Sequence, residues 1–264
     1  MKTSELPALG WRLLRVQILN ELQYRANFFV QLLQSVLSIG ISLVVVGLVF
    51  AQIHDLNGWT KPQLMAFVGV FTLVGGVLRM FVRPMLERLV RDVQDGTLDF
   101  VLVRPMDAQF VVSTRAVDAW QGVDVLAGLA VIGWAVIGLR PMVGPVEVLL
   151  FLVTLVFGLL IIYCFLFCLM STVFWFVRVD GIAEMFESVY QAGRWPLTIY
   201  PGWLRVSLTF VVPIGFSISL PAAAIAHRLS GAAVLGEALA ACALALVTRY
   251  VFTTALRHYS GASA

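Results

Sequence analysis

Long apolar runs fill most of this sequence, and several are long enough to cross a membrane as helices. The run from Asn27 to Ala51, for example, contains no charged residue. A hydrocarbon core of about 30 Å needs about 20 such residues per helix, and lipid tolerates few other backbone structures. The 264 residues are 60% hydrophobic and only 12% charged, against about 25% charged in an ordinary soluble domain. The predicted fold class is therefore all-α: a polytopic membrane protein without a separate soluble domain.

Six transmembrane helices are expected within this single transmembrane domain. Before the first of them, residues 10–26 predict a helix lying in the membrane interface, or else a plain cytosolic lead-in. The fourth apolar run is longer than one membrane thickness, so we expect that helix to tilt or to extend beyond the bilayer. The clear spans are predicted at 27–51, 63–82, 120–139, 146–177 and 234–256.

The region between the fourth and last spans permits more than one topology. Residues 182–194 have an apolar face opposite a polar one at helical spacing, which predicts an amphipathic helix. That helix could be cytosolic, interfacial, or a span whose polar face lines a pathway. Residues 206–226 are apolar but are interrupted by Pro213 and Pro221, which fits either a kinked span or a re-entrant hairpin.

Polar side chains in the first span follow a single stripe, because they recur at helical spacing over three turns. Polar groups are costly in lipid, so the stripe should face the bundle, a partner subunit or a transport path. Ordinary helix packing explains it equally well. The residues assigned to a translocation path are those of this stripe and of the later amphipathic helix: Gln31, Gln34, Ser38, Ser42, Glu184, Glu187 and Gln191.

Asp124 lies about one turn inside the third span, where a carboxylate requires a partner or water. Arg115 precedes it by too many residues for an i,i+3 or i,i+4 pair. A proton path usually needs more than one such group. The position therefore favours a structural or gating role over proton coupling.

Positive residues indicate the orientation, because short cytoplasmic loops carry an excess of them. Of the 18 lysines and arginines, only Lys61, Arg140 and Arg228 fall in turns assigned to the outer side. The others, including all those from Arg79 to Arg115, are assigned to the cytosolic side. If residues 181–198 are a span, two more arginines move outside, and the orientation is unchanged. Both termini are thus expected in the cytosol.

Residues 83–105 form the one long polar interruption of the apolar pattern. Within it, Leu86, Leu89, Val90 and Val93 predict the apolar ridge of a short charged helix that ends near Gly96. Such a ridge must lie on lipid headgroups, on its own bundle or in a groove of a partner protein.

The sequence VQDGTLDFVLVRPMD, in this same segment, resembles a signature of ABC transporter permeases of the type 2 exporter class. It is most similar to the bacterial branch with a GTLD followed by LxRP, and the resemblance extends over the whole chain. The resemblance implies a fifth span at 181–198 and a re-entrant outer hairpin at 201–226. It also implies an integral protein of the bacterial cytoplasmic membrane, surrounded by its lipids.

The resemblance further implies two partners: a cytosolic ABC ATPase subunit and a second permease, either a copy or a sister chain. ATP and magnesium would bind to the ATPase, because neither Lys2 nor Lys61 completes a phosphate-binding loop here. We expect no enzymatic activity, catalytic residue, metal site, bound cofactor or nucleic acid in this chain. The residues implied to couple it to the ATPase are Leu86, Arg88, Leu89, Val90, Arg91, Val93, Gly96, Leu98 and Asp99.

Two other classes of protein remain as alternatives at this point. An ion-coupled secondary transporter would normally carry several ionisable residues in its spans and an internal repeat. A membrane enzyme would need clustered catalytic side chains, whereas the three histidines lie far apart. An apolar bundle with a modest polar stripe favours an amphipathic or hydrophobic cargo for a transporter.

Overall fold

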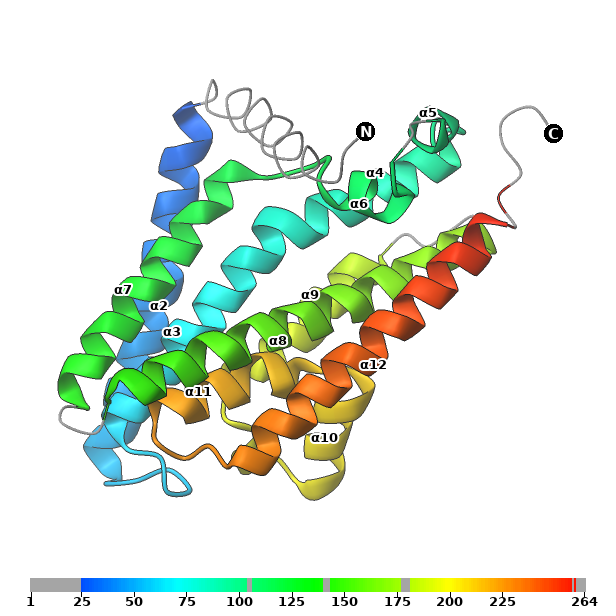
Figure 1. Ribbon diagram of the computed structural model, residues 1–264. Helices are drawn as coiled ribbons and strands as arrows, with labels where there is room; N and C mark the ends of the chain where they lie inside the picture. The colour runs from blue at the N-terminus through cyan, green and yellow to red at the C-terminus, as the bar shows by residue number, and fades with distance from the viewer. Residues whose placement is uncertain (1–24, 104–105, 140–142, 177–180, 258, 260–264) are drawn as a thin grey trace.

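The computed structural model describes residues 25–103, 106–139, 143–176, 181–257 and 259 (Figure 1). The predicted interfacial helix at 10–26 lies almost entirely outside these residues. Among the described residues the fold is all-helical, as predicted, and it contains no strand beyond one isolated bridge between Leu56 and Trp59.

Within the described residues, five helices are long and apolar enough to cross a membrane, or up to six if one bent helix pair is counted as a span. The first is α2 (Arg25–Gln52), which is largely exposed along its length. The others are one rod made of α3 (Lys61–Val77), η2 (Leu78–Val82) and α4 (Arg83–Gln94); η3 (Ala119–Gln121) with α7 (Gly122–Gly138); α8 (Pro145–Met170) with η4 (Ser171–Phe174); and α12 (Gly231–Leu256).

The rod continues without a break from Lys61 to Gln94, so the charged helix α4 extends the predicted second span directly. The π-helical segment η2 has a local cause. Pro84 has no N–H to donate to the carbonyl of Met80, and proline widens the preceding turn. The freed Met80 carbonyl accepts instead from the backbone N–H of Asp118 at 2.9 Å. Pro84 therefore accounts for the π-helical hydrogen bonding of η2. It also leaves the Met80 carbonyl free to bind the backbone of Asp118, just before the third span.

Helices α3 and α7 form the closest contact in the bundle, and glycines permit it. A Cβ at Gly128 would lie 2.6 Å from the backbone nitrogen of Leu73, and one at Gly69 would lie 2.7 Å from the side chain of Ile132. Both distances are shorter than real side chains allow. Small residues at such crossings let two helix backbones approach within the membrane.

Replacing Gly128 with alanine should therefore lower the stability of the bundle by about 1–3 kcal/mol, the usual range for overpacking. Gly133, on the same helix, is the matched control because a Cβ there meets nothing within 4 Å. There alanine should be neutral or stabilising by up to about 1 kcal/mol. Thermal unfolding in detergent measures both, and equal melting temperatures for the two variants would contradict this account of the crossing.

Residues 182–199 run antiparallel to the rod along most of its length. Near one end Arg83 pairs with Glu184, and near the other the indole of Trp59 donates to the Thr198 hydroxyl at 3.3 Å. The segment consists of α9 (Ile182–Tyr190), η5 (Gln191–Arg194) and η6 (Leu197–Ile199). The helix breaks at Trp195, which is extended as expected for a residue before proline. The region of the predicted fifth span thus follows the rod as a broken helix.

The region of the predicted hairpin, 201–226, contains two helical pieces bent at 93° to each other. One is α10 (Gly202–Val206) with η7 (Ser207–Val211), and the other is η8 (Gly215–Ser219) with α11 (Leu220–Ile225). In Figure 1 both lie at the end of the bundle that holds the α2–α3 turn, opposite α4, α5 (Asp99–Leu102) and α6 (Ala108–Ser113). This geometry fits either a broken span or a re-entrant loop.

Candidate functional site

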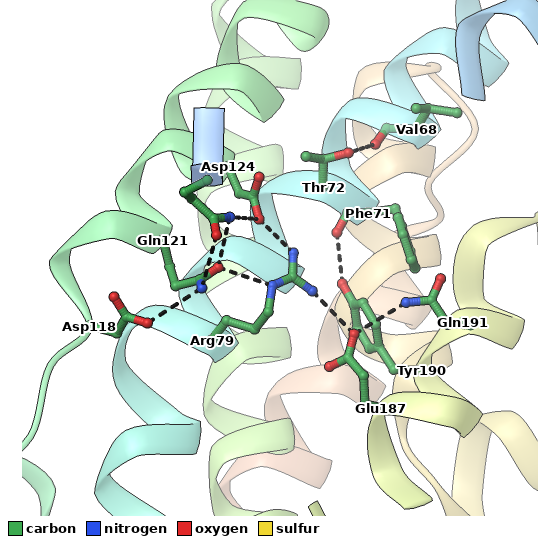
Figure 2. Close-up of polar contacts among 11 residues, drawn as sticks. Val68, Phe71, Thr72, Arg79, Asp118, Gln121, Asp124, Glu187, Tyr190 and Gln191 are labelled. Carbon is green, nitrogen blue, oxygen red and sulfur yellow. Dashed lines mark hydrogen bonds and ion pairs between the residues drawn. The ribbon is translucent and has the colours of Figure 1, made fainter. Parts of the chain in front are cut away.

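A polar network lies in the middle of the apolar bundle, and Arg79 of the η2 segment is its centre (Figure 2). The guanidinium donates through Nη2 to Asp124 of α7 at 2.8 Å and through Nη1 to Glu187 of α9 at 3.2 Å. Its Nε donates to the Gln121 side chain at 3.3 Å. One arginine therefore joins the rod to two other elements that cross the bundle.

The first span joins this network through Gln31. Its amide donates to Gln121 at 3.1 Å and to the Asp124 carboxylate at 3.2 Å. On α9, the Glu187 carboxylate also accepts a hydrogen bond from the amide of Gln191 at 3.2 Å. Four crossing elements thus share a connected set of side chains, and in each bond a charged or amide donor meets an acceptor.

The structure supplies the partner that the sequence predicted Asp124 to need. Only 8% of its side chain is exposed, against 25% for Arg79. The sequence analysis assigned Arg79 to the cytosolic end of the second span, and in the structure its guanidinium forms ion pairs with two carboxylates of the bundle, Asp124 and Glu187. Arg115 pairs instead with the buried Asp92 at 2.7 Å. A salt bridge with Arg79 supports the structural reading of Asp124.

Three cavities follow one another along the polar stripe of α2. The first, about 710 Å³, lies beside Val30 and Gln31 and is bordered by arginines of the rod. The middle cavity, about 220 Å³, is lined by Gln31, Gln34 and Ser38 together with Arg79 and Gln191. The third, about 90 Å³, is lined by Ser42 and Arg194. The residues that line both the first and the middle cavities are Gln31, Arg79 and Gln121.

The predicted path residues occupy different places relative to these cavities. Gln31, Gln34, Ser38 and Gln191 line the middle cavity, and Ser42 lines the third. Glu187 reaches the network only through Arg79 and Gln191. Glu184 is exposed and pairs with Arg83 at 3.4 Å. Five of the seven residues therefore lie along one series of cavities.

The apolar ridge of the charged helix faces inward. Leu86, Leu89 and Leu98 are buried within the chain itself, and Val90 and Val93 are partly buried against the same core. These leucine side chains are therefore not available to a partner, because their contacts are already made. Periodicity identified the buried face correctly, but it could not tell which of the three possible partners covers it.

The turn after this helix has the predicted left-handed glycine, with Gly96 at φ +67°. Asp92 stabilises it from inside: its carboxylate accepts from Thr97 at 3.1 Å and pairs with Arg88 and Arg115. Asp99 then begins the short helix α5. The turn is thus tied to the helix before it and to the segment that leads into the third span.

The exposed apolar surface at this end of the bundle lies just beyond the ridge. Phe100 has 76% of its surface exposed and Val103 has 83%, with Leu102 less exposed between them. Arg88 and Arg91 are the exposed charges on the adjoining helix. We call Phe100, Leu102 and Val103 the apolar tip. Sequence analysis missed it because α5, which carries Phe100 and Leu102, has only four residues and is too short to show a helical period.

Two further residues were also missed. Glu237 of α12 is fully buried, and among the described residues neither carboxylate oxygen has a hydrogen-bond partner. Its only signal in the sequence is a single acid in an alanine-rich apolar run. Nothing in the described structure explains why this carboxylate is buried. Arg194 lines both the middle and the third cavities.

Comparison with known proteins adds a family to this geometry. The family described as "ABC-2 family transporter protein" matches residues 36–263. The matched range contains the whole rod, the residues of the Arg79 network other than Gln31, and the apolar tip, and it includes Ser38 and Ser42 of the α2 stripe. Searches of the curated proteins and of the solved structures give no match.

Proposed function

The chain belongs to the ABC-2 family of transporter proteins and is thus a membrane permease of an ABC transporter, and we propose that it forms the translocation path of an ATP-driven exporter. Its energy comes from a separate cytosolic ATPase subunit. Two permeases, this chain and a copy or a sister chain, pair in the bacterial cytoplasmic membrane. Six crossings then bring both termini to the cytosol, with residues 201–226 as an outer hairpin.

The observation that carries the proposed path is the series of three cavities along α2. Their polar lining lies between apolar helices that lipid can surround, and polar groups inside a membrane mark pathways more often than surfaces. The middle cavity adjoins an ion-paired network contributed by four crossing elements. A change in how these elements pack would alter the cavity and the network together.

Residues of the α4–α5 end are proposed to dock on the ATPase, and the apolar tip forms the contact. The tip is exposed and apolar, whereas a monomeric soluble surface would seldom keep two such side chains together. Arg88 and Arg91 border it and supply charge for steering the partner. In this proposal the inward ridge from Leu86 to Val93 fixes the tip to the bundle.

The alternative of an ion-coupled secondary transporter finds no support in Asp124. Its carboxylate is held by a 2.8 Å salt bridge to Arg79 and by a hydrogen bond from Gln31, which fits a structural role between the crossing elements. Family membership argues in the same direction.

Co-purification tests the proposed partnership directly. The permease would be tagged and expressed with candidate ABC ATPase subunits encoded beside it, then isolated in mild detergent. We expect one ATPase to be retained in stoichiometric amount and its hydrolysis rate to change on binding. Recovery of a stable, monodisperse permease that binds none of them would refute the proposal.

Cysteine labelling tests the cavities without knowledge of the cargo. In a background lacking the three native cysteines, Gln34→Cys should react with a water-soluble maleimide at least about tenfold faster than Val36→Cys. A thiol reacts as the thiolate, which forms in the hydrated middle cavity but not on the lipid-facing side of α2, where Val36 is exposed. Equal, slow labelling of both positions would show that the stripe is dry and serves only packing.

A further inference from the structure

We propose that the cargo of this permease is an amphiphile with an anionic headgroup, and that Arg194 is the residue that recognises the anion in the middle cavity. This inference rests on the proposed function and specifies its substrate class. It derives from the charges and hydrogen-bond partners around the three cavities along α2.

Arg194 differs from Arg79, the other arginine of the middle cavity. Each of the three guanidinium nitrogens of Arg79 donates a hydrogen bond, to Asp124, Glu187 and Gln121 respectively. No described residue accepts a hydrogen bond from Arg194 or forms an ion pair with it, and its buried Nε has no partner. Its guanidinium lies over the ring of Phe71, with the guanidinium carbon 5.7 Å from the ring centroid. A guanidinium within a membrane is costly unless an acceptor reaches it.

A second unsatisfied polar group lines the same cavity. The side chain of Ser35 is 3% exposed, and its hydroxyl oxygen has no hydrogen-bond partner among the described residues. Gln34 and Ser38 flank it on the stripe of α2. A guanidinium and a hydroxyl that both lack partners in one cavity form a donor set suited to an oxyanion such as a phosphate.

The charge balance of the middle cavity favours an anion rather than a cation. Its charged lining residues are Arg79, Arg194 and Asp124. The Asp124 carboxylate accepts hydrogen bonds from Arg79 and Gln31. The carboxylate of the nearby Glu187 accepts hydrogen bonds from Arg79 and Gln191. Glu187 does not line the cavity, so the lining itself has two arginines against one carboxylate, a net charge of +1. Arg194 is the charged lining residue that forms no ion pair among the described residues.

The first cavity extends this preference toward the α4 end of the bundle. Five arginines line it against two carboxylates, Glu87 and Asp118. The Asp118 carboxylate already accepts from the Trp120 backbone and the Gln121 amide, and Glu87 is shared by Arg83 and Arg91. An anion moving from this end toward Arg194 would pass positive charge along the way.

The position of the cavities against the first span favours an amphiphile over a small soluble anion. Val30 lines the first cavity and belongs, with Phe29 and Leu33, to an exposed apolar surface of α2. A lipid whose headgroup lies in the first cavity can therefore keep its acyl chains in the surrounding membrane. Basic pockets between membrane helices bind lipid headgroups in this manner.

Native mass spectrometry of the full permease in detergent tests the proposal, with phosphatidylglycerol and phosphatidylcholine of equal chain length as probes. Wild type should retain the anionic lipid in preference. Arg194→Gln should weaken phosphatidylglycerol binding at least about tenfold, the loss expected for one charge-assisted interaction, and leave phosphatidylcholine unchanged. Arg194→Lys should keep part of the preference, because it retains the charge.

Arg257→Gln is the matched control, since Arg257 is exposed at the end of α12 and lines none of the three cavities. Equal binding of the two lipids by wild type would overturn the proposal, and so would an unchanged affinity in Arg194→Gln. An equal loss in Arg257→Gln would overturn it as well, by showing general surface attraction.

Competition with glycerol 3-phosphate distinguishes the two sources of the anion. Displacement of the lipid would show that the phosphate alone is recognised, and no displacement would show that the site requires a membrane-anchored headgroup. All of these measurements use the permease without an ATPase, so they remain interpretable if the proposed partnership fails. If the partnership holds and lipid recognition fails, the Arg194→Gln variant should still co-purify with the ATPase, because Arg194 lies away from the apolar tip.

Discussion

Replacing Arg79 with methionine should lower the free energy of unfolding by about 3 kcal/mol. Removing one partner of a buried ion pair leaves an uncompensated charge, which typically costs about 3–5 kcal/mol. We expect the lower end of that range because a quarter of the Arg79 side chain remains exposed. Two carboxylates, on Asp124 and Glu187, would lose their partner at once. Thermal unfolding in detergent measures the loss.

Neutralising both carboxylates should restore most of that stability. The triple variant Arg79→Met, Asp124→Asn, Glu187→Gln removes the unpaired charges, so its melting temperature should return more than halfway to wild type. Arg83→Met is the matched control, because its ion pairs are half exposed and such pairs are worth less than about 1 kcal/mol. If Arg79→Met melted like wild type, or the triple variant recovered nothing, the network would not hold the crossing elements together.

Replacing both Phe100 and Val103 with aspartate should reduce retention of the ATPase, and stimulation of its hydrolysis, by at least about tenfold. These two side chains are the most exposed parts of the apolar tip, and each buried apolar side chain contributes about 1.5–3 kcal/mol to a contact. The substitutions put carboxylates into an apolar interface. They should leave the permease folded, because exposed positions seldom affect stability by more than about 0.5 kcal/mol.

Two other variants make this experiment specific. Gln94→Glu adds a negative charge at the same end of the bundle without removing an apolar side chain, so coupling should persist. Leu89→Asp should instead prevent folding, because that leucine is buried in the chain. If the double aspartate variant still bound and stimulated the ATPase as wild type does, the tip would not be the docking surface.

Sequence pattern predicted the parts of this protein that depend on neighbours along one helix. The spacing of Gln31, Gln34 and Ser38 placed them on one stripe, and all three line the middle cavity. Helical periodicity likewise found the buried face of the charged helix. In both cases one helix fixes which side chains share a face, and it says little about what covers that face.

The missing information concerns contacts between helices. Asp124 was expected to need a partner, but that partner, Arg79, lies 45 residues away in sequence, and helical spacing gives no sign of their contact. The apolar tip has no periodic signal. Helical spacing placed Arg194 on the polar face of the amphipathic helix, but it could not show that Arg194 lacks a hydrogen-bond or ion-pair partner among the described residues. The second span was predicted to end at Val82, where the composition changes from apolar to charged. The helix continues to Gln94 because charged residues form helices as readily as apolar ones.

The unbroken rod from Lys61 to Gln94 has a mechanical consequence. Its 34 residues span about 50 Å at about 1.5 Å per residue, well beyond a hydrocarbon core of about 30 Å. Such a rod is long enough to connect the α4 end of the bundle with the middle of a membrane, and the π-helical segment η2 is the one irregular turn described within it. In the proposed complex, a movement of α4 driven by the ATPase would be transmitted to this π-helical turn, where Pro84 removes one backbone hydrogen bond. Arg79 lies in that turn, so flexing it would move the one guanidinium on which four crossing elements depend.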